Sequence, residues 1–364
     1  RLRRHHRREV GHAPAHHGRG VPLRLRSAHA PFRQYGKGAC DDCEDSMRPD
    51  IYEVRPGLFC AVIPFPNNPL KAVNCYIVLD SERTLVIDMG FDLPVCREAL
   101  LYALKECGRS WESVQVVATH SHPDHIGLLD SLAPVGSPVL AGFASIEDLI
   151  SSYRAVRDAV PLLLDGALLD ESFCQVRFSP CANVPVQRVV EGDEIAAGRY
   201  RFQVMETPGH DEWHICLCDA SAGVMLVGDH VLRKIVPSVN VFTPHRDLLG
   251  SYLNNLQRMP ATGALTALPG HGRPIEDVRA EVDRIRTYHL DKVEEIYELV
   301  CQGFDDLESI AARSSGLFSC WSHQHPLRRI WLVTEVMAYL VKLAHDGRVA
   351  ISCDASCRYL FEPC

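Results

Sequence analysis

Apolar runs of a few residues, separated by turn residues, dominate the chain between residues 51 and 118. Runs of this length with turns on both sides predict the strands of a β-meander. One longer segment has apolar residues three and four positions apart, which predicts a helix. The predicted strands are residues 57–63, 73–79, 83–90 and 113–118, and the predicted helix is 94–107.

A second series of strands follows farther along the chain. The predicted strands are 186–190, 200–206, 214–218, 224–227 and 265–268, with a helix at 248–259 before the last of them. Residues 143–183 contain apolar runs without strand alternation, so we expect them to be helical or irregular and to lie over one face of the site. Two such series predict an α/β fold in which two sheets pack face to face with helices outside.

The chain changes character at both ends. Residues 1–46 are rich in Arg, His, Pro and Gly and lack apolar periodicity, which predicts a disordered basic extension. Met47 directly precedes the first strand pattern, so we expect this extension to be absent from the working protein, with a basic transit peptide as the weaker alternative. Residues 47–275 form the predicted α/β domain. Residues 276–364, with helical patterns and a final pair of short apolar runs, form a predicted helical domain.

The composition is that of an ordinary globular protein, with 46% hydrophobic and 23% charged residues. No apolar stretch approaches the roughly 20 residues that cross a bilayer, and the chain shows no signal peptide, so we expect a cytoplasmic protein with no membrane partner. The 15 cysteines are scattered and odd in number, which favours reduced thiols. Cys40 and Cys43 are spaced like half of a zinc ribbon, but a second Cys-x-x-Cys pair is lacking.

Charge is distributed unevenly along the sequence. Residues 1–46 carry ten Lys/Arg against five Asp/Glu, residues 276–364 carry ten against fifteen, and the whole chain has a formal net charge of −8. Both predicted folded domains are therefore acidic. This balance argues against a broad nucleic-acid-binding face, although a local basic cleft stays open, and it favours a small-molecule substrate as the partner.

The most distinctive stretch is Thr119–Gly127, directly after the predicted strand 113–118. It places three imidazoles and a carboxylate within six positions, those of His120, His122, Asp124 and His125. Nitrogen and oxygen ligands of this kind suit a borderline metal such as zinc. We expect Gly127 to close the turn and a helix to follow it. Because ligands commonly bind at the carboxyl ends of strands in α/β sheets, the stretch predicts a metal site rather than a polar surface loop.

Three further strand ends each offer one candidate ligand. They are His210 in Thr-Pro-Gly-His, Asp229 in Gly-Asp-His, and His271 in Pro-Gly-His-Gly. A lone histidine at such a position is more often a surface residue than a ligand. All four strand ends together favour one shared site.

With these residues in this order, the chain resembles the metallo-β-lactamase superfamily of hydrolases over roughly residues 51–275. The resemblance implies an αββα sandwich and two metal ions. It assigns His120, His122 and His210 to one metal, Asp124, His125 and His271 to the other, and Asp229 to a bridge between them. Asp88 matches the family's strand-end aspartate, which orients the ligand loop, although Met89 stands where a threonine is commoner. His214 and His230 adjoin the ligands, and supporting or packing roles are favoured for both over direct catalysis or a hydrogen bond to substrate.

The chemistry expected of this site is hydrolysis. Two zinc ions, with Fe or Mn as alternatives, would share a hydroxide that attacks the scissile carbonyl or phosphoryl group. Asp124 would steer this hydroxide and help to protonate the leaving group. The favoured substrate is a small ester or thioester.

The C-terminal helices and hairpin resemble the winged-helix extension of lactamase-β-like members, some of which are similar to endoribonucleases and others to hydroxyacylglutathione hydrolases. One interpretation is nucleic-acid contact by Arg328, Arg329 and Lys342. The acidic balance favours the other, a helical cap that walls the substrate cleft or forms a homodimer contact. A metal-dependent endoribonuclease is therefore the alternative function. A winged-helix binding protein and an oxygen-reducing di-iron protein, which would resemble the pattern with glutamate in place of His122, are disfavoured.

Overall fold

The computed structural model describes residues 48–65, 70–129, 131–132, 136–149, 151, 184–355 and 358–364. The predictions for residues 1–46, with Cys40 and Cys43, lie outside this range. Residues 146–149 are helical, and most of the predicted helical or irregular segment 143–183 also lies outside the described residues.

The first sheet has seven strands in the order of the sequence. The first four form an antiparallel meander, and the fourth to seventh are parallel. Parallel pairing of β4 and β5 requires a crossover, which the helix α1 (Pro94–Glu106) supplies. The strands are β1 (Asp50–Arg55), β2 (Leu58–Pro64), β3 (Ala72–Val78), β4 (Thr84–Ile87), β5 (Val114–Ala118), β6 (Val139–Ala141) and β7 (Val186–Arg188).

The second sheet has five strands in the order β12-β11-β10-β9-β8. They are β8 (Glu194–Ala197), β9 (Tyr200–Glu206), β10 (Ile215–Asp219), β11 (Val224–Gly228) and β12 (Thr266–Pro269). Only the β11–β12 pair is parallel within this sheet, and α5 (Leu248–Arg258) lies in the crossover that joins the two strands. The carboxyl ends of β11 and β12 therefore lie at the same edge of the sheet.

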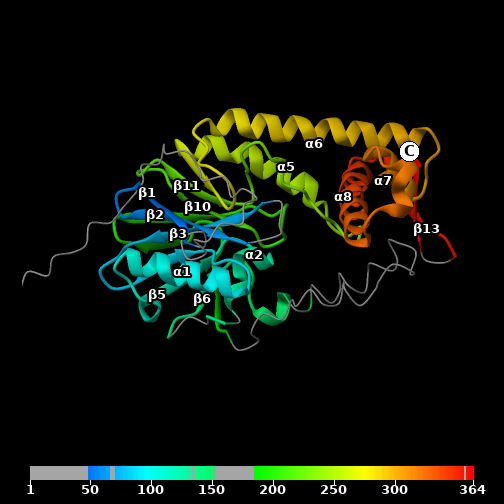
Figure 1. Ribbon diagram of the computed structural model, residues 1–364. Helices are drawn as coiled ribbons and strands as arrows, with labels where there is room; N and C mark the ends of the chain where they lie inside the picture. The colour runs from blue at the N-terminus through cyan, green and yellow to red at the C-terminus, as the bar shows by residue number, and fades with distance from the viewer. Residues whose placement is uncertain are drawn as a thin grey trace, which may run out of the picture.

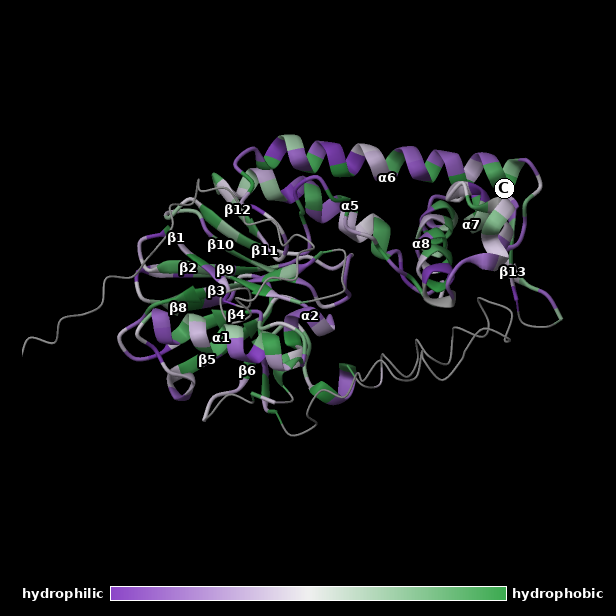
Figure 2. Ribbon diagram, in the orientation of Figure 1, coloured by the Kyte–Doolittle hydropathy of each residue, from purple (hydrophilic) through white to green (hydrophobic). Residues whose placement is uncertain are grey.

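Apolar side chains form three core layers, one between the two sheets and one on the outer face of each sheet. Facing residues of the two sheets form the central layer, in which Tyr200 and Phe202 stack with ring centroids 5.5 Å apart. The helix α1 covers the outer face of the first sheet, because its residues Ala99, Leu100 and Ala103 repeat at helical spacing and are buried. The helix α5 covers the outer face of the second sheet. This αββα sandwich confirms the predicted fold class, and Figure 2 shows its strands predominantly hydrophobic.

The chain after the sandwich is mainly helical. Its elements are α6 (Val278–Cys301), α7 (Leu307–Ser314), α8 (Pro326–His345), β13 (Val349–Cys353) and β14 (Tyr359–Pro363). The helix α6 starts beside the sandwich and runs on to α7 and α8 (Figure 1). One continuous apolar core joins the second sheet, α5 and these helices. The two last strands pair antiparallel, as predicted for the C-terminal hairpin. None of the described helices is both long and apolar enough to span a membrane.

Short elements account for most differences from the sequence predictions. Strands β1, β6 and β8 were not predicted as separate strands. Among the described residues, no α-helix begins directly after Gly127. The short helix α2 (Pro123–Ile126) instead starts inside the ligand stretch and passes into the 3-10 segment Gly127–Leu129. The 3-10 segments are Trp111–Ser113, Gly127–Leu129, Met259–Thr262 and Phe318–His323.

Candidate metal centre

The seven candidate ligands converge at one end of the sandwich, where strands of both sheets finish. They fall into three groups whose nitrogen and oxygen ligand atoms lie within 4.8 Å of one another. The groups are His120 with His122 and His210, His120 with His125 and Asp229, and Asp124 with His125 and His271. The structure thus brings together all the residues singled out at the four strand ends.

Asp229 lies at the centre of this cluster. Its Oδ1 atom is 3.6 Å from Nε2 of His125, and its Oδ2 atom is 3.8 Å from Nε2 of His210 and 3.4 Å from Nε2 of His271. Asp124 approaches from the other side, with Oδ2 3.2 Å from Nε2 of His271. One carboxylate therefore faces histidines of both ligand sets, as a bridging group must.

Several buried atoms of the cluster lack the hydrogen bonds that buried polar atoms normally make. Within the described part of the chain, Nε2 of His120, His125 and His271 and Oδ1 of Asp229 have no hydrogen-bond partner. The opposite ring nitrogens of His125 and His271 are engaged, which leaves the two Nε2 atoms free as lone-pair donors. Imidazole nitrogens and carboxylate oxygens arranged in this way fit divalent metal ions.

Asp88 supports the cluster from behind. It follows β4 in a left-handed conformation, with φ of 60°, and is almost fully buried. Its Oδ1 accepts from the backbone N–H of Thr119 at 2.9 Å, and its Oδ2 accepts from Thr119 Oγ1 and from Nδ1 of His125, both at 2.8 Å. This carboxylate therefore fixes the start of the ligand stretch and the orientation and tautomer of His125.

His271 is held by residues that the sequence analysis did not identify. Its Nδ1 donates to the backbone carbonyl of Ala72 at 2.7 Å. The amide of Asn74 donates to the carbonyls of Pro269 and Gly272, and Tyr76 donates to that of Pro269. The sequence did carry one signal for Asn74: it is a polar residue inside a strand whose other residues are mostly apolar and buried.

His214 and His230 have different surroundings. Nδ1 of His214 donates to Thr207 Oγ1 at 2.8 Å, and its Nε2 accepts from the backbone N–H of Asp229 at 3.2 Å. His214 therefore positions the Asp229 backbone. His230 is fully buried and packs edge-on against Tyr252, with ring centroids 4.9 Å apart, and its ring nitrogens have no hydrogen-bond partner in the described residues.

Glycines allow the ligand loops to approach one another closely. A Cβ on Gly270 would lie 2.5 Å from Asp229 Oδ1 and 2.7 Å from a ring carbon of His125. Gly127 caps the C-terminus of α2 and so closes this turn, as predicted, with an ordinary helical φ of −57°. A Cβ there would lie 2.6 Å from the backbone nitrogen of Asp92, so the glycine permits close backbone packing.

The electrostatics of the cluster favour positive charge. Burial raises the pKa of Asp124, but the neighbouring His125 and His271 outweigh it and lower that pKa to about 2. Burial lowers the pKa of His271, but the carboxylates of Asp229 and Asp124 outweigh it and raise that pKa to about 10. Protons and metal cations therefore compete for the same carboxylate-rich position.

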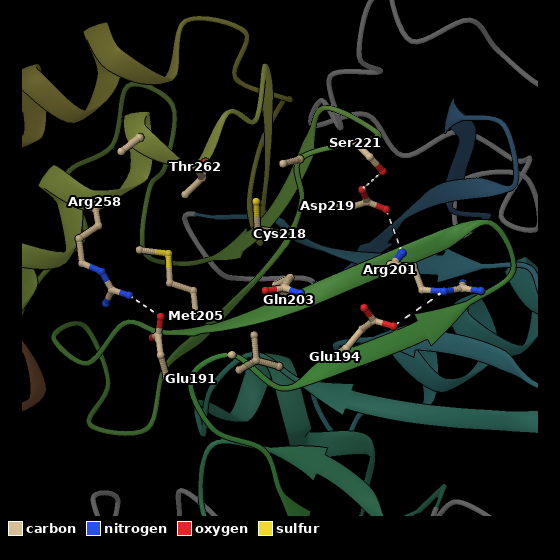
Figure 3. Close-up of a pocket in the computed structure, with 14 residues that line it drawn as sticks. Glu191, Glu194, Arg201, Gln203, Met205, Cys218, Asp219, Ser221, Arg258 and Thr262 are labelled. Atoms are coloured by element: carbon tan, nitrogen blue, oxygen red, sulfur yellow. Dashed lines mark hydrogen bonds and ion pairs between the residues drawn. The ribbon is translucent and has the colours of Figure 1, made fainter.

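A hollow of about 390 Å³ adjoins the cluster on the side of His122 and His210. Its other lining residues are Ser121, Asp211, Glu212, Trp213, Asn240, Val241, Phe242, Thr243, His245, Arg246 and Leu248. A larger hollow over β9 and β10 is shown in Figure 3, and its lining includes none of the candidate ligands. There Arg258 pairs with Glu191 at 2.6 Å and Arg201 with Glu194 at 3.8 Å, so these charges largely satisfy one another.

Comparisons with known proteins place this arrangement in a family. The sequence profile of the Metallo-beta-lactamase superfamily matches residues 68–271. An Atrochrysone carboxyl ACP thioesterase of Aspergillus fumigatus is 26% identical over 298 residues, which cover 79% of this chain and 61% of that protein. A protein of the same name from Aspergillus terreus is 23% identical over 213 residues, which cover 58% of this chain and 53% of that protein. The chain thus spans less than two thirds of the length of either relative.

A solved structure supports the same assignment at the level of the fold. The beta-lactamase domain protein of Burkholderia ambifaria matches with a TM-score of 0.74 and 22% identity, over 86% of this chain and 94% of that one. The profile match covers more than half of the present sequence, including all seven candidate ligands. The chain therefore belongs to the metallo-beta-lactamase superfamily.

Proposed function

We propose that this protein is a metal-dependent hydrolase of acyl thioesters that uses a pair of divalent ions, with zinc as the first choice. One observation carries the proposal: His122 and His210 of the ligand cluster line the same hollow as apolar side chains. The apolar side chains are those of Trp213, Val241, Phe242 and Leu248. An acyl chain would bind against this wall, with its carbonyl group directed toward the cluster. The names of the two Aspergillus relatives, both ACP thioesterases, point to the same substrate class.

Two of the three groups described above would each hold one ion. His120, His122 and His210 would hold one, Asp124, His125 and His271 the other, with Asp229 between them. When bound, divalent ions supply Lewis acidity, which polarises a carbonyl oxygen and lowers the pKa of water toward about 7.

The other steps fall to the side chains themselves. The Asp124 carboxylate, with its pKa lowered to about 2, is ionised at neutral pH and would accept a hydrogen bond from the attacking water. The apolar wall would hold the acyl chain and exclude bulk water from the thioester. Hydrolysis adds water across the C–S bond and releases a carboxylic acid and a thiol, so no serine or cysteine nucleophile is required.

The structure gives little support to the nucleic-acid contacts considered for the C-terminal helices. Arg329 is buried and forms an ion pair with Glu308. Lys342 forms an ion pair with Asp346. The order of three helices and a hairpin agrees with a winged helix, yet two of its three candidate basic residues already have acidic partners. Ribonuclease activity therefore stays the alternative.

Assays on the zinc-loaded full chain would separate these functions. We would measure hydrolysis of a medium-chain acyl thioester and of single-stranded RNA, with Asp124→Ala as the blank. Asp291→Ala, which removes an exposed carboxylate of α6, is the matched control. We expect thioester turnover in the wild type and the control and none in the blank. RNA cleavage without thioester turnover would contradict the proposal.

A further inference from the structure

A second hollow, of about 550 Å³, lies beside the one at the metal cluster. Residues of α5, α6, α8 and the segment before α5 line it, among them His245, Arg246, Asp247, Arg286, Lys342 and His345. His245 and Arg246 line both hollows, so the two meet at these residues. The second hollow is thus next to the proposed acyl site.

Arg286 is the cation that most requires explanation. It is partly buried, and its NH1 donates to the backbone carbonyl of Leu253 at 2.5 Å. In the amide orientation that satisfies both groups, Gln257 accepts from NH1 and NH2 of Arg286 at 3.0 and 2.6 Å. Both partners are uncharged, and no carboxylate of the described residues lies within 4.0 Å of this guanidinium. A partly buried cation held only by neutral groups favours an anion beside it.

The other two cations of the lining already have acidic partners. Lys342 binds Asp346 one turn along α8, with Nζ to oxygen distances of 2.5 and 2.6 Å, and Arg246 forms an ion pair with Glu212. The carboxylate in the lining is that of Asp247, which caps α5 by accepting from the backbone N–H of Gly250 at 2.6 Å. Arg286 is therefore the cation of this lining that has no acidic partner among the described residues, and His245 and His345 line the same hollow.

We propose that this second hollow binds the phosphate group of the thiol carrier to which the acyl group is attached. The guanidinium of Arg286, which has only neutral partners, suits a phosphate, and Lys342 lines the same hollow beside it. The residues shared by the two hollows would let one substrate occupy both. The phosphate takes no part in the reaction and leaves with the thiol. The inference rests on the proposed thioester hydrolysis and narrows its substrate to phosphorylated carriers, such as phosphopantetheine thioesters.

RNA phosphates share this chemistry, but two observations favour the small carrier. The C-terminal region carries ten Lys/Arg against fifteen Asp/Glu, so it offers no broad positive face to a polyanion. Asp346 and Glu212 pair with lining residues of this hollow, and their carboxylates would repel a longer polyanion.

Two substrates with the same acyl chain test the inference: S-acyl-4′-phosphopantetheine and the unphosphorylated S-acyl-pantetheine. We expect the wild type to prefer the phosphorylated substrate by about tenfold or more in kcat/KM, mainly through KM, because charge-assisted contacts are strong. Arg286→Gln combined with Lys342→Gln should remove this preference and leave turnover of S-acyl-pantetheine unchanged. Arg279→Gln, an exposed arginine of α6 outside the lining, is the matched control and should keep it.

The outcomes separate this inference from the proposed function. Equal turnover of both substrates by the wild type would overturn the phosphate site and leave thioester hydrolysis intact. Failure to hydrolyse either would overturn the proposed function, and calorimetric titration with free 4′-phosphopantetheine would then decide the site. Binding that the double variant loses would support it, and equal binding by both proteins would overturn it. Cleavage of single-stranded RNA that the double variant loses would assign the hollow to nucleic acid instead.

Discussion

The backbone carbonyl of Ser238 accepts a hydrogen bond from Nδ1 of His210 at 2.8 Å. This contact leaves Nε2 of His210 to face Nδ1 of His122, 3.0 Å away. Ser238 belongs to the segment between β11 and α5, whose orientation depends on the C-terminal helices. Those helices therefore support the candidate metal centre as well as extending the core of the second sheet.

The segment is attached to both long C-terminal helices. His289 of α6 lies with Nε2 3.2 Å from the carbonyl of Pro237. The Asn240 amide donates to Thr334 Oγ1 of α8 at 2.8 Å, and the backbone N–H of Val241 donates to the Thr334 carbonyl at 3.0 Å. A substitution at Thr334 should therefore change the position of His210.

Thr334→Val tests this coupling. The valine keeps the shape but removes one of the two acceptors of the Asn240 amide, the other being the backbone carbonyl of Trp331, so we expect the free energy of unfolding to fall by about 1 kcal/mol. We also expect zinc affinity to fall several-fold, measured by competition with a chromophoric chelator. Thr287→Val, at an exposed position of α6, is the control. A stability loss with unchanged zinc affinity would show that the helices do not support the site.

Asp88→Asn tests how His125 is oriented. The asparagine keeps an acceptor for Thr119 but presents an N–H group to Nδ1 of His125, so the ring proton would move to Nε2 and block that atom as a ligand. We expect metal affinity to fall by about 10–100-fold, as for other groups that orient metal ligands. Titration of metal into the variant, after a chelator has removed any bound metal, measures this loss of affinity. Asp92→Asn, an exposed aspartate nearby, should bind metal as the wild type does, and an equally unaffected Asp88→Asn would contradict the role of Asp88.

Glu335 of α8 gives a pH-dependent prediction. Burial raises its pKa to about 6, although Lys292 lowers it in part. The folded protein thus binds this proton more tightly than the unfolded chain does, so its contribution to stability is present below the unfolded pKa and is lost as the pH rises through about 6. At pH 7.5 the ionised carboxylate should cost about 2 kcal/mol at most.

Glu335→Gln should therefore be more stable than the wild type by about 1–2 kcal/mol at pH 7.5 and show a much smaller difference at pH 5. Urea unfolding at both pH values gives these free energies. Glu298→Gln, at an exposed position of α6, is the control and should show no such difference. A stability gain of the same size at both pH values would mean that Glu335 is not titrating in this range.

The sequence predicted most of the sandwich because long strands and amphipathic helices have clear periodicity. Strand β1 alternates polar residues with the buried Tyr52 and Val54, and that signal was available. Strands β6 and β8 have only three and four residues. The strand conformation of β6 depends on pairing with β5 and β7, which are distant in sequence, whereas β8 pairs with the adjacent strand β9.

The candidate ligands were identifiable because each follows a strand and carries a group that binds metal. Most of the residues that hold these ligands in place could not be identified from the sequence, because their contacts join residues that are distant in the chain. The Asn74 amide bonds the carbonyl of Pro269, and the Ser238 carbonyl bonds His210, and neither partner is near in sequence. A backbone carbonyl also has no residue-specific signature, so Ser238 could be found only from the structure.

The most direct test of the central claim measures metal content and thioester hydrolysis on the same sample of the full chain. We expect two divalent ions per chain, loss of turnover when a chelator removes them, and recovery when zinc is added back. We also expect Asp124→Ala to keep the melting temperature within a few degrees of the wild type and to have no turnover. Thioester hydrolysis that persists in the metal-free protein, or full turnover by Asp124→Ala, would contradict that claim.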